Sequence, residues 1–70
     1  MLSDLLSRMF GASWYALSRT EQIAVERDVR EMAEDDFDGS AIVAARELRT
    51  RIGGAEVLPS YAKCLTARPR

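Results

Sequence analysis

The sequence lacks histidine altogether and contains a single cysteine, Cys64. One cysteine cannot form a disulfide within the chain, and without histidine or a second thiolate no zinc site is expected. A nucleophilic Cys64 would also need an activating base, a role that histidine usually fills. We therefore expect Cys64 to be a small buried or half-buried residue, and we expect no metal, no cofactor and no enzymatic activity.

The sequence also lacks a long hydrophobic run. No apolar segment approaches the roughly 18 residues that a membrane-spanning helix needs. The opening residues, MLSDLLSRMF, lack the basic segment with which a secretory signal begins. With one thiol and no export signal, the expected compartment is the cytoplasm, and no membrane partner is expected.

The chain is short, and small domains expose much of their surface, so a single core gives only marginal stability. With disulfides and zinc excluded, good helix packing or self-association has to stabilise the fold. The alanine, leucine and charged residues suit helices better than strands. We predict an all-α protein with a single domain over residues 1–66 and a frayed tail over residues 67–70.

The clearest element is a central helix over residues 19–35. Ser18 followed by Glu21 forms a capping box, in which each side chain bonds a backbone N–H of the other. Within the helix, Val25, Val29, Met32 and Ala33 share one face. The predicted helix ends near residue 35 because its continuation would place a carboxylate of Asp36 in the apolar face.

A first helix precedes it, with an apolar face formed by Leu2, Leu5, Leu6, Met9 and Phe10. Gly11 either ends this helix or lies on its polar side. Continuing the helix places Leu17 on the same apolar face, and a glycine within a helix costs only about 1 kcal/mol. We favour one helix over residues 2–17, with two shorter helices as the alternative.

A third helix is predicted over residues 40–52, capped by Asp38 or Ser40 and ended by Gly53 and Gly54. Its small residues would let it approach the central helix closely, as an antiparallel hairpin. The remaining tail is predicted to be irregular, although one helical turn over residues 60–66 is an alternative. The predicted fold is thus a bundle of three helices with a helical hairpin at its centre.

The first helix has more apolar surface than such a hairpin could cover, so we also expect a homodimer. The residues assigned to the core or to the dimer interface are Leu2, Leu5, Leu6, Met9, Val25, Val29, Met32, Leu48 and Ile52.

Charge is distributed unevenly along the chain. Residues 19–40 carry three basic and eight acidic groups, a net charge of −5, whereas residues 41–70 carry six basic and two acidic groups, a net charge of +4. Glu34, Asp36, Asp38 and Gly39 fall at positions 1, 3, 5 and 6 of a calcium-binding EF-hand loop. The match fails at position 1, which is Glu rather than Asp, and at position 12, where Ala45 replaces the required glutamate. We interpret the acidic stretch as a solvated helix end.

The arginines of the third helix suggest a helix-turn-helix motif that binds DNA. The acidic residues before that helix would be repelled by phosphates, however, and the arginines do not share one face. Nucleic acid is therefore a disfavoured partner. The corresponding alternative function is a small transcriptional regulator that uses Arg46, Arg49, Arg51, Lys63, Arg68 and Arg70.

By elimination, the sequence favours a small protein-protein interaction module that regulates or inhibits a larger protein partner. Inhibitors encoded by phages or mobile elements are of this kind. The acidic stretch suits a partner with a basic surface. Aromatic residues and arginine dominate many interfaces. The predicted partner-binding residues are Phe10, Trp14, Tyr15, Glu31, Glu34, Asp35, Asp36, Asp38 and Arg46.

Overall fold

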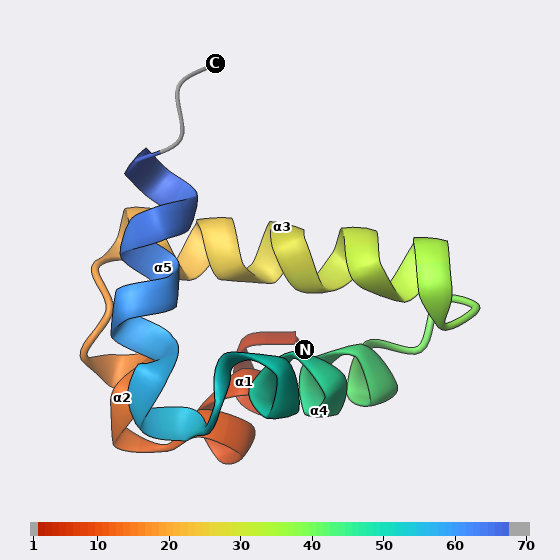
Figure 1. The fold of residues 1–70 in the computed structure, drawn as a ribbon, viewed down its shortest axis with the longest axis horizontal. Helices are drawn as coiled ribbons and strands as arrows, with labels where there is room; N and C mark the ends of the chain where they lie inside the picture. The colour runs from red at the N-terminus through yellow and green to blue at the C-terminus, as the bar shows by residue number, and fades with distance from the viewer. Residues whose placement is uncertain (1, 68–70) are drawn as a thin grey trace.

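The computed structural model describes residues 2–67, which form five α-helices and one short 3-10 helix and contain no strand (Figure 1). The α-helices are α1 (Leu2–Phe10), α2 (Ala12–Tyr15), α3 (Arg19–Asp36), α4 (Ala41–Ile52) and α5 (Leu58–Ala67), with the 3-10 helix η1 (Ala55–Val57) before α5. The all-α prediction is confirmed. Most of the predicted frayed tail, residues 68–70, lies outside the described residues, whereas Ala67 ends α5.

The prediction of one helix over residues 2–17 is wrong, because Gly11 separates α1 from α2. Gly11 has φ 58° and ψ −133°, a conformation that side-chain-bearing residues rarely adopt. Its N–H still bonds the carbonyl of Ser7 at 2.8 Å, and its own carbonyl accepts from the N–H of Trp14 at 3.0 Å. The sharp turn redirects the chain so that Phe10, Trp14 and Leu17 are all buried.

Helix α3 begins as predicted. The Ser18 hydroxyl accepts from the N–H of Glu21 at 3.2 Å, and the Glu21 carboxylate accepts from the N–H of Ser18 at 2.8 Å. The helix ends at Asp36, one residue later than predicted. Asp36 is exposed at this end of the helix, so its carboxylate is not buried and does not force an earlier stop.

Helix α4 also follows the prediction. The Ser40 hydroxyl accepts from the N–H of Val43 at 3.3 Å, and Gly53 ends the helix in the left-handed conformation. Helices α3 and α4 run antiparallel and pack against each other as a hairpin, with Ala44 and Ala45 buried (Figure 1). Small residues therefore do allow this pair of helices to approach closely.

The prediction of an irregular C-terminal tail is wrong, because α5 is a helix that packs across the N-terminal half of α3 (Figure 1). Leu58 and Ala62, one turn apart, are both buried. Pro59 lies in the first turn, where a missing N–H removes no helical hydrogen bond. The helix therefore starts before the proline.

The core contains residues from every α-helix, and no polar or charged side chain within residues 2–67 is buried in it. Helix α1 packs on α4, α2 and η1, so the chain itself buries Leu6 and Phe10 and half-buries Leu2, Leu5 and Met9. A second chain is not needed to cover these residues, and the homodimer stays a prediction. The core residues are Leu6, Phe10, Trp14, Leu17, Val25, Val29, Ala33, Ala44, Ala45, Leu48, Leu58 and Ala62.

Candidate functional site

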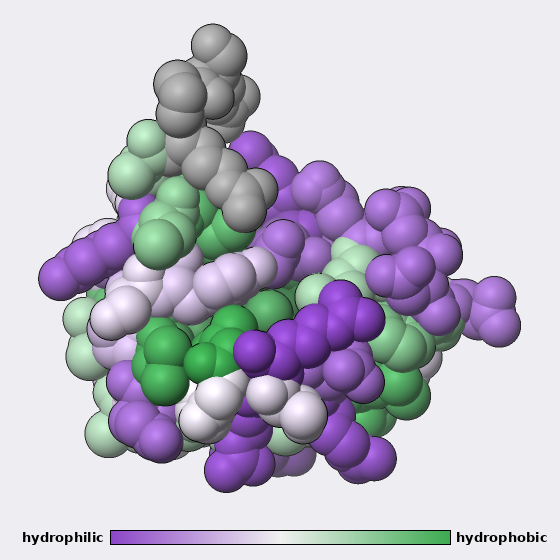
Figure 2. Space-filling view, viewed as in Figure 1, coloured by the Kyte–Doolittle hydropathy of each residue, from purple (hydrophilic) through white to green (hydrophobic). Residues whose placement is uncertain are grey.

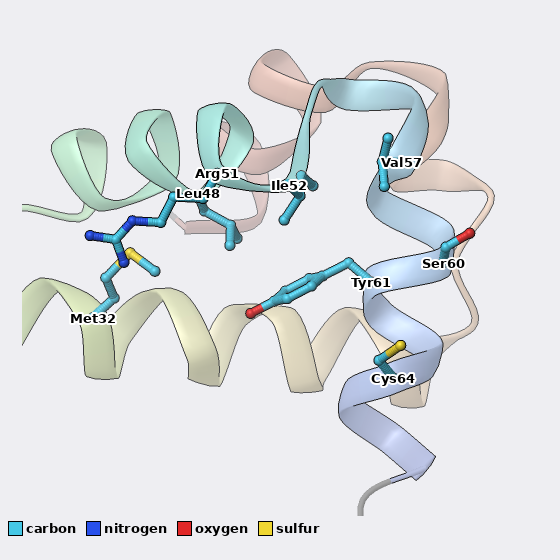
Figure 3. Close-up of a pocket in the computed structure, with 8 residues that line it drawn as sticks. All are labelled: Met32, Leu48, Arg51, Ile52, Val57, Ser60, Tyr61 and Cys64. Carbon is cyan, nitrogen blue, oxygen red and sulfur yellow. The ribbon is translucent and has the colours of Figure 1, made fainter.

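An open groove of about 470 Å³ lies where α3, α4, η1 and α5 meet (Figure 3). Its walls come from three parts of the sequence, so it exists only because α5 crosses the α3–α4 hairpin. Most of its lining is apolar. The lining residues are Met32, Leu48, Arg51, Ile52, Val57, Ser60, Tyr61 and Cys64.

Tyr61 reaches from α5 toward α3 across the groove (Figure 3). Its hydroxyl donates a hydrogen bond to the Asp28 carboxylate, and both side chains are half-buried. This bond joins residues 33 positions apart in the sequence. It therefore fixes α5 on α3 and orients the tyrosine ring within the groove.

Two sides of the groove carry polar groups. On the α4 side, the Arg51 Nε lies 3.3 Å from the Glu47 Oε2, one helical turn earlier, so the positive charge is matched within the chain. On the α5 side, Ser60 and Cys64 are exposed. The prediction that Cys64 would be buried or half-buried is wrong, because α5 turns this residue toward the opening of the groove.

On the α3 side, the groove lies close to a group of acidic residues. Met32 lines the groove, and Asp28, Asp35 and Asp36 are one helical turn from it, so helical spacing places them on the same side of α3. Figure 2 shows hydrophobic residues gathered between α5 and the C-terminal part of α4, and hydrophilic residues over the C-terminal half of α3. The exposed acidic residues at the C-terminal end of α3 and in the turn that follows it are Glu31, Glu34, Asp35, Asp36 and Asp38. We call these five residues the acidic end.

The acidic end does not have the geometry of a calcium loop. Glu34 and Asp36 lie within α3, so they cannot wrap around an ion as residues of an EF-hand loop do. Over the described range, no three acidic, cysteine or histidine side chains are grouped so that they could hold a metal ion.

The predicted partner-binding aromatic residues separate into two environments. Phe10 and Trp14 are each 3% exposed and belong to the core, so this fold does not offer them to a partner. Tyr15 is 72% exposed on α2, and Arg46 is exposed on α4. Tyr61 is the aromatic residue that lines the groove, and the sequence-based selection missed it.

The predicted core or dimer residues lie mainly inside the molecule. Leu6, Val25, Val29 and Leu48 are buried, whereas the others are half-buried and packed against the core. The half-buried ones are Leu2, Leu5, Met9, Met32 and Ile52. Met32 and Ile52 also line the groove, so they are exposed in part where a ligand could contact them.

Three comparisons with known proteins, against models of protein families, curated proteins and solved structures, found no match. Inference about function therefore rests on the residues themselves. Within residues 2–67, none of the helices has the length and apolar character to cross a membrane.

The sequence-based selection missed Val57, Ser60 and Tyr61 because the tail after Gly54 was predicted to be irregular. The spacing of Tyr61, Cys64 and Leu65 does indicate a helical face, which is a usable signal. Asp28 gives no such signal, because its hydrogen bond to Tyr61 depends on how α5 crosses α3.

Proposed function

We propose that this protein is a small non-enzymatic interaction module that regulates or inhibits a larger protein with a basic surface. One observation carries the proposal: an open apolar groove whose α3 wall, Met32, lies one helical turn from the exposed carboxylates of Asp35 and Asp36. Apolar area removed from water supplies binding free energy, about 25 cal/mol per Å². Charges at the edge steer association and select the partner.

The alternative, a DNA-binding regulator, has less support. The two residues at the start of α4 that would enter the major groove, Ile42 and Val43, are exposed but carry no hydrogen-bonding side chain. Asp38 precedes them and would face phosphates. In addition, α3 and α4 pack as an antiparallel hairpin, whereas the helices of a helix-turn-helix cross at a steep angle. A gel-shift assay with duplex DNA at low salt should show no complex, and a salt-sensitive shift would favour the alternative.

The proposal is tested by affinity capture from an extract of cells that encode the protein. Partners are quantified by mass spectrometry for the wild type and for a triple variant with Asp35→Asn, Asp36→Asn and Asp38→Asn. All three side chains are exposed, so the fold should be retained. We expect a partner with a basic surface that the wild type retains and the triple variant loses.

A matched control is Glu56→Gln, which removes an exposed acidic charge from η1, away from the acidic end. This variant should keep the partner. Equal capture by the wild type and the triple variant would contradict a role for the acidic end. Capture of no partner by the wild type would contradict the proposed function itself.

A further inference from the structure

We infer that the groove binds one amphipathic helix of the protein partner, with the basic edge of that helix next to α3. This inference rests on the proposed function and specifies the segment that is recognised. The bound helix would place apolar side chains into the groove and lysine or arginine side chains beside Asp35 and Asp36.

The size and lining of the groove suit side-chain anchors of this kind. Its volume of about 470 Å³ lies within the range of about 300–1,000 Å³ that is usual for ligand pockets. Met32, Ile52 and Val57 supply flexible or branched apolar contacts, and Tyr61 supplies an aromatic ring. Successive anchors on a helix are three or four residues apart, so one apolar face can place neighbouring side chains into the same groove.

Other modes of peptide recognition fit less well. Residues 2–67 contain no β-strand, so this part of the chain offers no sheet edge to which an extended peptide could be added. Proline-rich segments bind grooves lined by several aromatic rings, whereas Tyr61 is the one aromatic residue in this lining. Helix-in-groove recognition is the mode that the lining supports.

Charge around the groove sets the orientation of the ligand. On the α4 side, Glu47 already neutralises Arg51. On the α3 side, Asp28 accepts the Tyr61 hydroxyl, while Asp35 and Asp36 are exposed. The Arg51 side chain extends toward Met32 in Figure 3, but its charge is paired with Glu47, so the exposed carboxylates that can match a basic edge are Asp35 and Asp36, one helical turn beyond Met32.

The second pocket lacks this asymmetry. It has a volume of about 390 Å³ between α1 and the start of α4, and its lining includes both Asp4 and Arg8. Asp4 and Arg8 give this pocket one charge of each sign and no adjacent pair of exposed carboxylates such as Asp35 and Asp36 on α3. The groove beside α3 is therefore the assigned site.

The probe for this inference is a pair of synthetic helical peptides, each about four turns long. Both peptides share the same leucine face, and one carries lysine and the other glutamate along one edge. Binding to the full chain is followed by two-dimensional ¹H–¹³C NMR of the methyl groups. We expect the lysine peptide to shift the methyl signals of Met32, Ile52 and Val57 and to leave those of Ile23 and Val43 unchanged.

The lysine peptide should also bind more tightly than the glutamate peptide. Two exposed charge pairs give a preference of about fivefold at low salt, which decreases as salt is added. In the double variant Asp35→Asn and Asp36→Asn, this preference should disappear while the groove methyl signals still shift. Equal affinities in the wild type, or shifts at Ile23 and Val43 instead of the groove, would overturn the inference.

A pair of variants on α5 tests the location of the site. Ser60 is exposed in the lining, so Ser60→Arg introduces a bulky positive group into the groove at little cost to folding. Thr66→Arg adds the same charge to the same helix at a residue outside the groove lining. Binding of the lysine peptide should weaken about tenfold in the first variant and stay unchanged in the second. Equal binding by both variants would overturn the site assignment.

The two proposals can fail separately. If the triple acidic variant loses a captured partner but neither peptide shifts the groove signals, the protein-binding function stands and the helix-in-groove inference is wrong. If the lysine peptide binds the groove but the wild type captures no partner, the site is a helix-binding groove and the proposed function is wrong.

Discussion

At the scale of single residues, Gly11 determines how the first part of the chain enters the core. The sequence offered two readings of this residue, because a glycine within a helix costs only about 1 kcal/mol. That local cost could not decide between them. The deciding factor is the burial of Phe10, Trp14 and Leu17 together, which depends on contacts with elements far along the chain.

Substituting Gly11 with L-alanine should destabilise the protein by about 1–3 kcal/mol, because the positive φ of 58° strains a residue that has a side chain. No atom lies within 4 Å of the added Cβ, so the cost arises from the backbone alone. The measurement is chemical denaturation of the two proteins. D-alanine at this position, introduced by chemical synthesis, should instead stabilise the fold by about 0.4–1 kcal/mol. Destabilisation by both isomers would contradict the backbone explanation.

A second residue-scale prediction concerns the hydrogen bond from Tyr61 to Asp28. Tyr61→Phe keeps the ring but removes the donor, so stability should decrease by about 1 kcal/mol and the melting temperature by about 4–8 °C. Thermal unfolding followed by circular dichroism measures this. Tyr15→Phe, at a residue that is 72% exposed, is the control and should have no effect. Equal melting temperatures for wild type and Tyr61→Phe would show that the bond does not fix α5.

At the scale of helices, the elements with local chemical signals were predictable and the others were not. The capping box of Ser18 and Glu21 and the glycines after Ile52 locate both α3 and the end of α4 from the sequence alone. Residues 58–67 contain no capping box, so their sequence favoured an irregular tail, with one helical turn over residues 60–66 as the alternative. The groove could not be predicted either, because one of its walls is α5.

Ala62→Asp tests whether α5 is an integral part of the fold. Ala62 is fully buried, so an aspartate there places an unpaired carboxylate in the core and should cost at least about 3 kcal/mol. We expect lower helicity and a lower midpoint of denaturation by circular dichroism. Lys63→Asp introduces the same residue at the exposed neighbouring position and should have little effect. Similar stabilities of the two variants would contradict the packing of α5 on α3.

At the scale of the whole molecule, the arrangement of the helices determines which apolar residues are covered and which are open to a partner. Helix α1, which the sequence marks as the most apolar segment, is largely covered by α4, α2 and η1. The apolar surface that is open to a partner lies instead in the groove and at the exposed side chains of Tyr15, Ile23, Ile42 and Val43. The sequence of one helix could not show which of its apolar residues are covered, because that depends on the arrangement of all the helices.

The homodimer prediction can be tested where Leu2, Leu5 and Ile42 line the second pocket. Ile42 is 55% exposed, so Ile42→Lys should leave the fold intact while placing a charge in an apolar contact between two copies. Sedimentation equilibrium should give a dimer for the wild type and a monomer for the variant. A wild-type monomer at micromolar concentration would contradict the homodimer.

The central claim is that a partner protein occupies the groove beside the acidic end. Photo-crosslinking from a benzophenone group attached to Cys64, which lies exposed in the groove lining, tests it most directly. The matched control moves the thiol along α5, with Cys64→Ser and Thr66→Cys. We predict that the partner crosslinks from Cys64 and not from position 66, through a segment of the partner that is apolar on one face and basic beside it. Equal crosslinking from both positions, or capture of the partner without any crosslink from Cys64, would contradict the claim.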